Sequence, residues 1–130
     1  MKLTHKSGMV FCLIAVAAFI FTESLLAQDP TKVDSKHYKV VFENDSVRVL
    51  RIMYGPREKS VMHEHPNAVA VFLSGFNGRF TLPDGKTSDI SGKSGEAIWT
   101  PAGKHLPENL GDRKFELILV ELKQHGAKKM

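Results

Sequence analysis

From residue 38 onward, the sequence consists of short runs of β-branched and aromatic residues, each interrupted by glycine, proline, asparagine or aspartate. No stretch of about a dozen residues carries apolar residues at the spacing of an amphipathic helix. Strands that recur about every 8 to 12 residues, with turn signals between them, are typical of a sandwich or a closed barrel. The sequence therefore predicts a single all-β domain.

We predict eight strands, near residues 39–43, 47–54, 60–65, 68–74, 79–82, 86–90, 97–100 and 114–123. The segment Pro83-Asp84-Gly85-Lys86 has the composition of a tight hairpin turn. The last run, 115–122, is apolar on both faces over much of its length. Such a strand is expected to be covered on each side, by a second sheet or by a partner subunit.

Residues 1–27 have the layout of a secretory signal peptide. Lys2 and Lys6 precede an uninterrupted apolar stretch of 13 residues, 9–21, and polar residues then lead to Ala27, where we predict cleavage. This stretch is shorter than the roughly 20 residues that a membrane-spanning helix needs. We therefore expect an exported protein, periplasmic or secreted, without stable membrane insertion after processing. An uncleaved anchor is the alternative.

The mature chain is predicted to comprise a flexible segment at 28–37, a barrel domain at 38–124 and a polar tail at 125–130. The only cysteine, Cys12, lies in the signal peptide, so the mature domain has neither a disulfide nor a thiol nucleophile. The formal net charge of the chain is +4, and its basic residues are scattered. Without a basic stripe, no nucleic-acid partner is expected.

Three histidines are the strongest candidates for a functional site. His63 and His65 are two residues apart, and side chains at positions i and i+2 of a strand project from the same face. His105 follows a Pro-Ala-Gly turn and is expected to come from a neighbouring strand. Three imidazoles with open positions are typical of a working metal site, so we predict that these three residues bind a divalent ion.

The histidines belong to two motifs. The first, residues 55–75, begins and ends with glycine and contains His-Glu-His. The second, residues 95–109, begins with glycine, contains Pro-Ala-Gly and His105, and ends with Asn109. Together they resemble the two motifs of the cupin family, over roughly residues 40–123. The resemblance implies one jelly-roll β-barrel of the cupin-2 type, and also a homodimer, because small cupins commonly pair.

The sequence departs from the cupin pattern at one important position. Many cupins have a glutamate a few residues after the histidine pair as a fourth ligand, and here that position falls on Val69 or Ala68. On a regular strand Val69 would share the face of His65, whereas Glu64 would point away from it. The resemblance therefore implies a three-histidine site that water or a ligand completes.

The residue types leave the metal and the function open. Imidazole ligands do not choose among Fe, Mn, Ni, Cu and Zn. Three neutral ligands leave the charge of a divalent ion uncompensated, which favours a small-molecule ligand that is anionic or enolisable. One hypothesis is a metal-dependent oxygenase or isomerase, although no side chain stands out as its proton-handling residue. A second is a non-catalytic domain that binds or senses a small ligand, with or without a metal. A third is a structural accessory of an exported complex.

Other residues are given structural roles. His37 and His125 lie in polar terminal stretches and are expected to be solvated. Asn109 is expected to fix a turn through backbone hydrogen bonds. Arg48 and Arg51 lie on opposite faces of one predicted strand, so at most one is expected to point inward, where it would clamp a carboxylate; surface ion pairs are the main expectation. For most of a group of large apolar residues we expect core packing rather than ligand contact: Met62, Phe72, Phe80 and Trp99.

Overall fold

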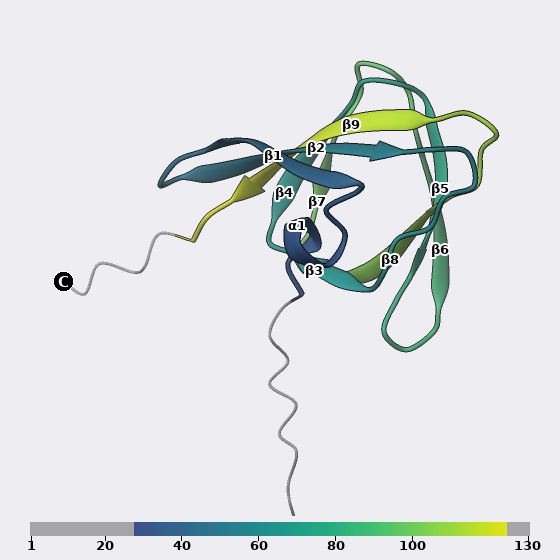
Figure 1. The fold of residues 1–130 in the computed structure, drawn as a ribbon, viewed down its shortest axis with the longest axis horizontal. Coiled ribbons are helices and arrows are strands. Elements are labelled where there is room, and N and C mark those ends of the chain that lie inside the picture. Colours follow the sequence, from purple (N-terminus) through teal and green to yellow (C-terminus); the bar gives the residue numbers. More distant parts are fainter. Residues whose placement is uncertain (1–27, 125–130) are drawn as a thin grey trace, which may run out of the picture.

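The structure is a computed structural model that describes residues 28–124 of the chain. The predicted signal peptide and polar tail, with His125, lie outside the described residues. The described part contains one short helix and nine strands (Figure 1): α1 (Pro30–Val33), β1 (Tyr38–Glu43), β2 (Val47–Tyr54), β3 (His63–His65), β4 (Ala68–Phe72), β5 (Phe76–Thr81), β6 (Thr87–Gly92), β7 (Ala97–Thr100), β8 (Gly103–Asn109) and β9 (Phe115–Leu122).

The strands form two antiparallel sheets. The first has the order β1-β2-β9-β4-β7 and the second the order β3-β8-β5-β6. Figure 1 shows β1, β2 and β9 crossing one side of the molecule, with β3 and β8 on the opposite side. Buried side chains between the sheets come mainly from alternate positions of β2, β4 and β9, the period of two that a strand imposes. The predicted all-β barrel is confirmed.

β9 is the central strand of the larger sheet and pairs with β2 on one side and β4 on the other. Its residues Phe115, Leu117 and Leu119 are buried in the core. Ile118 and Val120 alternate with them and point to the outer face, where they are only partly buried. One side of this doubly apolar strand is thus covered by the second sheet, as predicted, whereas no element between residues 28 and 124 covers the outer side.

The hairpin between β5 and β6 has the predicted turn. Gly85 has a φ of 83°, and its backbone N–H donates to the carbonyl of Leu82 at 2.9 Å. The amide of Leu82 donates in turn to the carbonyl of Lys86 at 2.8 Å. Glycine adopts this left-handed backbone without strain, which explains its place in the turn.

β8, the strand that carries His105, was expected as a neighbour of the histidine pair, but its range is missing from the eight predicted strands. Its sequence contains Gly103 and Pro107, two residues that rarely occur inside strands. β8 lies between β3 and β5, and Pro107 still accepts a hydrogen bond from the amide of Ser60 at 2.9 Å. Pairing on both sides therefore imposes the extended conformation in spite of the local sequence.

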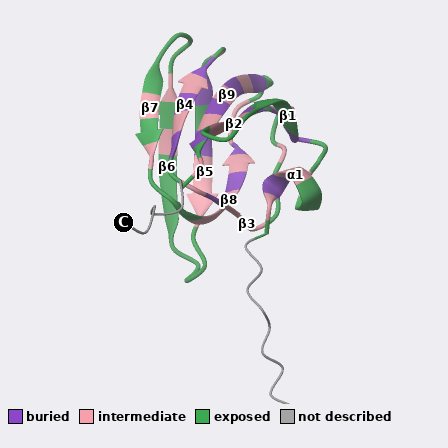
Figure 2. Ribbon diagram, turned by 90° about the vertical axis from the view of Figure 1, so that its left-hand side faces the viewer, coloured by how far each residue is buried: buried purple, intermediate pink, exposed green. Residues whose placement is uncertain are grey.

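The prediction of a flexible segment at 28–37 is wrong. Asp29 caps α1 by accepting the amide of Thr31 at 2.9 Å, and Pro30 occupies the first turn, where its missing N–H costs nothing. His37, predicted to be solvated, is 5% exposed. Figure 2 shows that this segment, beside β1 and β3, contains buried residues as well as exposed ones. The four-residue α1 is the only helix described, and it is far too short to cross a membrane.

Candidate metal centre

The pairing of β3 with β8 brings the three predicted histidines together. In this antiparallel pair His63 lies directly opposite His105, and His65 shares the inward face of β3 with His63. Each histidine offers one ring nitrogen, and these nitrogens all lie within 4.8 Å of one another. The cluster is compatible with a divalent metal ion. The sequence predicted this convergence from the His-x-His spacing and the turn before β8.

The hydrogen bonds of His63 and His65 decide which nitrogens face the centre of the cluster. The Nδ1 of His63 lies 2.8 Å from the carbonyl oxygen of Val61, and the Nδ1 of His65 lies 2.6 Å from a carboxylate oxygen of Glu121. Because both partners only accept, both Nδ1 atoms carry the hydrogen. The Nε2 atoms are left to face each other, and they are 3.1 Å apart.

Two nitrogen lone pairs at this separation repel each other unless a cation lies between them, either a metal ion or one proton. A Zn–N bond is about 2.0–2.1 Å long, so two imidazole nitrogens on one ion lie roughly 2.8 to 3.4 Å apart at ligand angles between about 90° and 110°. The observed 3.1 Å falls in that range. The residues present therefore fit a metal ion.

Burial keeps two of the histidines free of protons. Burial, together with the nearby ring of His65, lowers the pKa of His63 to about 4 and that of His105 to about 3. Near neutral pH a metal ion thus has no proton to displace from either ring. The ring of His105 also stacks on Phe80, with the ring centres 4.2 Å apart. Phe80 therefore packs against a candidate ligand.

Glu121 supports the site and was missed by the sequence analysis. Its side chain is buried, one carboxylate oxygen faces His65 and the other accepts from the Nε of Arg48 at 2.6 Å. Burial opposes its ionisation, but these two hydrogen bonds outweigh that effect and hold its pKa below the ordinary value. A carboxylate behind a histidine is the usual means of fixing the orientation of a metal ligand. Arg48 also pairs with Asp29, which ties the N-terminal segment to this support.

The expected position of Val69 is wrong. Val69 points to the outer face of its sheet, while Ala68 and Ala70 are buried on the inner face. Residues 66 and 67 separate β3 from β4, and the two strands belong to different sheets. Alternation of side chains holds only within one strand, so a spacing of four residues does not place Val69 on the face of His65. Ala68 lies opposite Glu121 in the register, so β4 offers no carboxylate here, and Glu121 on β9 contacts the Nδ1 of His65 rather than replacing the fourth ligand. The alternation of β3 leaves Glu64 between the two buried histidines and on the opposite face, as predicted.

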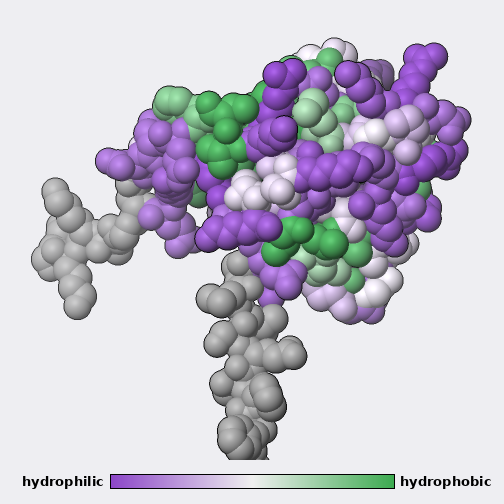
Figure 3. All heavy atoms as spheres, in the orientation of Figure 1, coloured by the Kyte–Doolittle hydropathy of each residue, from purple (hydrophilic) through white to green (hydrophobic). Residues whose placement is uncertain are grey.

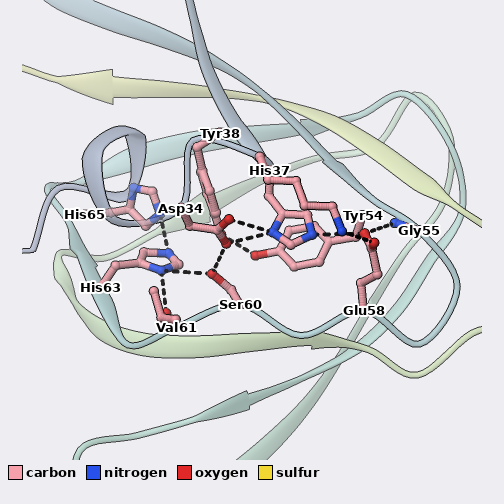
Figure 4. Close-up of polar contacts among 11 residues, drawn as sticks. Asp34, His37, Tyr38, Tyr54, Gly55, Glu58, Ser60, Val61, His63 and His65 are labelled. Atoms are coloured by element: carbon pink, nitrogen blue, oxygen red, sulfur yellow. Dashed lines mark hydrogen bonds and ion pairs between the residues drawn. The ribbon is translucent and has the colours of Figure 1, made fainter.

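A further buried histidine, His37, lies beside the cluster. The Nδ1 of His37 lies 2.7 Å from a carboxylate oxygen of Asp34, and its Nε2 lies 2.9 Å from one of Glu58. Figure 4 shows these groups in a line that Ser60 joins to His63. The hydroxyl of Ser60 donates to Asp34 and lies 3.5 Å from the Nδ1 of His63. The N-terminal segment is therefore hydrogen-bonded to the surroundings of the histidine cluster.

A cavity of about 370 Å³ opens beside the cluster inside the barrel. His65 and His105 border it, and most of its remaining lining is aromatic or aliphatic, including Phe72, Phe76 and Phe80. Phe72 also belongs to the buried core, as expected, and so does Phe76, for which no role was predicted. The hydroxyls of Tyr38 and Tyr54, which also border the cavity, lie 2.6 Å apart and bond to each other.

The remaining predictions have mixed outcomes. Asn109 fixes a turn as expected: its Nδ2 donates to the carbonyls of Gly55 and Arg113, at 2.8 and 2.9 Å. The first glycine of one motif and the last asparagine of the other are thereby joined. Trp99, expected in the core, is 56% exposed. Arg48 forms ion pairs as expected, although one of them is with a buried carboxylate rather than at the surface.

The fold is similar to that of solved cupins. A cupin domain from Bordetella pertussis matches with a TM-score of 0.62 and 22% identity, over 67% of this chain and 92% of that one. A RmlC-like cupin with a double-stranded β-helix fold, from Methanocaldococcus jannaschii, has a TM-score of 0.53 and 16% identity, over 65% and 77%. A cupin superfamily protein from Desulfitobacterium hafniense has a TM-score of 0.51 and 15% identity, over 67% and 76%.

No family model matches the sequence, and no curated protein matches it either. The likeness therefore rests on structure and on the two sequence motifs. Both sheets, the inward histidines and the solved neighbours agree on the architecture that the motifs implied. The protein has the cupin fold.

Proposed function

We propose that the protein binds a divalent metal ion through His63, His65 and His105 and holds a small-molecule ligand in the barrel against that ion. The observation that carries the proposal is the pair of Nε2 atoms of His63 and His65, 3.1 Å apart. Both rings have their Nδ1 hydrogens engaged elsewhere, so the facing nitrogens need a cation between them. His105 adds a third nitrogen from the opposite strand.

The cavity supports a ligand with two chemically different ends. Its volume of about 370 Å³ falls in the range of small-molecule pockets, and its aromatic lining favours an apolar body. The end beside His65 and His105 favours an oxygen group, anionic or enolisable, that can approach a cation. The proposed ligand is therefore a small molecule with an apolar body and a chelating head.

A divalent ion at this position supplies Lewis acidity and lowers the pKa of coordinated water. That chemistry agrees with an oxygenase or an isomerase. The residues around the cavity, however, favour the second candidate, a non-catalytic domain that binds or senses its ligand. Burial raises the pKa of Tyr38 and of Tyr54, so both stay protonated near neutral pH and donate hydrogen bonds rather than act as bases. Among the residues described as bordering the cavity, no carboxylate offers itself as a general base.

We also propose that the protein works outside the cytoplasm, after removal of residues 1–27. The support is the sequence alone: a short basic start, an apolar stretch of 13 residues and a small residue at the predicted cleavage position. Mass spectrometry of the protein recovered from the exported fraction should find an N-terminus near Gln28. Recovery with Met1 in place would contradict the proposal.

The metal proposal is tested by elemental analysis of protein purified without a histidine tag. After incubation with Zn²⁺, Mn²⁺, Ni²⁺, Cu²⁺ or anaerobic Fe²⁺ and then dialysis, the protein should retain about one ion per chain. His63→Ala, His65→Ala and His105→Ala should each lose it. Glu64→Ala is the matched control, because Glu64 lies between two of the histidines but on the opposite face.

Two results would contradict this part of the proposal. If no ion is retained under any condition, a proton rather than a metal lies between the facing nitrogens. If Glu64→Ala loses the ion as completely as the histidine variants do, the site is not the one described. Ligand binding and turnover are then measured on the loaded protein, where tight retention of a chelating apolar molecule without conversion favours the non-catalytic candidate.

A further inference from the structure

The first ten described residues, 28–37, lie along the histidine strand β3, and we call them the N-terminal clasp. β3 is the first strand of its sheet, and among the described strands it pairs with β8 alone. At its free edge the amide of Glu64, which lies between His63 and His65, donates to the carbonyl of Gln28 at 3.1 Å. Figure 1 shows α1, the helix of the clasp, beside β3. The clasp is therefore bonded directly to the strand that carries two of the three candidate ligands.

The clasp also reaches His65 through a row of charged side chains. Asp29 accepts a hydrogen bond from the Nη1 of Arg48 at 2.6 Å, and the Nε of Arg48 donates to Glu121 at 2.6 Å. The other carboxylate oxygen of Glu121 lies 2.6 Å from the Nδ1 of His65. The side chain of Arg48 is 17% exposed and that of Glu121 is 2% exposed, so salt screens their interaction only weakly. A change of charge at Asp29 is therefore transmitted to a candidate ligand.

Asp29 affects how strongly Glu121 acts on His65. Arg48 has one positive charge, which it shares between two carboxylates while the clasp is docked. Without Asp29 the whole charge would face Glu121, whose oxygens would then attract the Nδ1 hydrogen of His65 less strongly. A weaker acceptor behind an imidazole makes that imidazole a less basic ligand. The docked clasp thus strengthens His65 and adds negative charge to a site of three neutral ligands.

A second contact of the clasp lies beside His63. The carboxylate of Asp34 accepts from the hydroxyl of Ser60, which lies 3.5 Å from the Nδ1 of His63. Figure 4 shows Asp34 between Ser60 and His37, the last residue of the clasp. The clasp therefore contacts the surroundings of both histidines of β3.

The clasp is held mainly by polar contacts. Of its ten residues, Pro30 and His37 are buried and the others are exposed or partly exposed. In Figure 3, which has the orientation of Figure 1, hydrophilic residues lie next to a small hydrophobic group where α1 reaches the surface. Segments with few buried apolar contacts open at a lower free energy than the whole domain. The clasp is therefore able to detach while the barrel stays folded.

We propose that Asp29 is a positioning residue for the metal ligand His65, and that docking of the N-terminal clasp and binding of the ion stabilise each other. This inference rests on the proposed three-histidine site. Coupling between two equilibria is reciprocal. The factor by which a docked clasp strengthens binding of the ion therefore equals the factor by which the ion favours docking, and both sides of this relation are measurable.

The first test uses Asp29→Asn in the full chain, loaded with Zn²⁺. Asparagine caps a helix about as well as aspartate, so α1 should keep its N-cap while the charge that faces Arg48 is lost. Stopped-flow transfer of Zn²⁺ to a chelator should be about 3- to 10-fold faster than in the wild type, a smaller effect than loss of a carboxylate directly behind a ligand. Asp89→Asn is the matched control, because it also takes a carboxylate from an arginine, Arg79, but on β6 at the opposite edge of the sheet from β3.

The second test needs no substitution. A helix of four residues is not stable in water on its own, so exchange of the clasp amides reports its detachment. One such amide is that of Asp34, which donates to the carbonyl of Pro30 at 2.8 Å. Hydrogen exchange followed by mass spectrometry should be slower in the clasp, by about 3-fold or more, when Zn²⁺ is bound. The hairpin between β5 and β6 is the internal control and should change little.

The outcomes separate this inference from the metal site itself. Equal release of Zn²⁺ by Asp29→Asn and the wild type, or clasp exchange that Zn²⁺ does not change, would overturn the inference and leave the three-histidine site standing. Equal acceleration by Asp89→Asn would trace the effect to net charge and would also overturn it. A wild type that retains no Zn²⁺ contradicts the site, and the inference with it. Urea unfolding in EDTA is measured for both variants, because lower stability with an unchanged release rate would give Asp29 a purely structural role.

Discussion

The barrel contains two groups of buried histidines, joined through Ser60 and Asp34, that differ in where their ring nitrogens point. Both ring nitrogens of His37 face carboxylate oxygens of the same chain, and its ring stacks on Tyr54 with the centres 4.2 Å apart. The Nε2 atoms of His63 and His65 instead face each other. Burial alone therefore does not distinguish a structural histidine from a candidate ligand. The two kinds of histidine are distinguished by what the second ring nitrogen, Nε2, faces.

The largest effect on stability and on metal affinity is expected for Glu121, the carboxylate that contacts the candidate ligand His65. Glu121→Leu removes the acceptor of the Nδ1 of His65, and among the described residues it leaves Arg48 with Asp29 as its one side-chain partner. Loss of one member of a buried ion pair costs about 3–5 kcal/mol, and loss of a carboxylate behind a metal ligand lowers metal affinity about 10- to 100-fold. Urea unfolding and metal competition titrations measure the two effects.

Glu121→Gln is the matched control for this prediction, because the amide keeps the shape and one acceptor oxygen. It should recover part of the affinity. If Glu121→Leu binds metal as tightly as the wild type, the carboxylate does not orient His65. The hydrogen-bond partners of a buried ring would then not distinguish the candidate ligands from His37.

His37→Leu is expected to separate stability from metal binding. The change removes one donor to the carboxylate of Asp34, which keeps the hydroxyl of Ser60, and loss of a hydrogen bond to a largely buried charged group costs about 1–3 kcal/mol. Because His37 supplies none of the three nitrogens of the cluster, metal stoichiometry should stay at the wild-type value. Urea unfolding with elemental analysis of the same samples checks both parts. A variant that folds but no longer retains metal would show that His37 belongs to the functional site.

Acidification should lower the free energy of unfolding, because His63 and His105 take up protons in the unfolded chain. The folded pKa values of His63 and His105, about 4 and about 3, lie below the ordinary value of 6.5. As pH falls below about 6.5 the unfolded chain takes up protons that the folded chain refuses, so the free energy of unfolding decreases. This contribution is fully present above the ordinary value and is lost as pH falls toward the folded pKa values.

The effect is measured by urea unfolding in EDTA between about pH 7 and pH 5, above the range in which most carboxylates titrate. The double variant His63→Leu/His105→Leu should show a flatter dependence than the wild type. An identical slope in both proteins would mean that these two histidines do not carry the pH dependence.

The sequence was a good guide where a pattern is local and a poor one where it depends on partners. Alternation within β3 placed His63 and His65 on one face, and turn residues marked most strands. A strand with His105 was expected, but the range of β8 was not predicted, because its extended form depends on β3 and β5. Val69 was misplaced, because a spacing of four residues was carried across a break between two sheets.

Glu121 illustrates a signal that was present but not used. Along β9 the inward positions are Phe115, Leu117 and Leu119, and the next one is a charged residue. A charge at a core position needs a partner inside the protein. By contrast, no local pattern could show that His37 pairs with Glu58, which is 21 residues away. Internal partners of that kind follow only from the folded topology.

The smallest effect is expected for Phe80, whose ring packs against His105. This prediction compares an aromatic contact to a candidate ligand with the hydrogen bond that Glu121 makes to His65. Phe80→Leu removes a ring stacked on His105 but keeps an apolar side chain of similar reach. Such a ring contact contributes about 0.5–1.5 kcal/mol beyond buried area, so stability should fall by about that amount. Metal stoichiometry should not change, because every nitrogen of the cluster is retained, although the ion should dissociate faster from a less constrained His105. Stopped-flow transfer of the ion to a chelator measures this rate, with Leu82→Ala, at another residue bordering the cavity, as the control. Equal rates in the wild type and Phe80→Leu would show that the strand pairing of β8 with β3, without the aromatic contact, is enough to hold His105 in place.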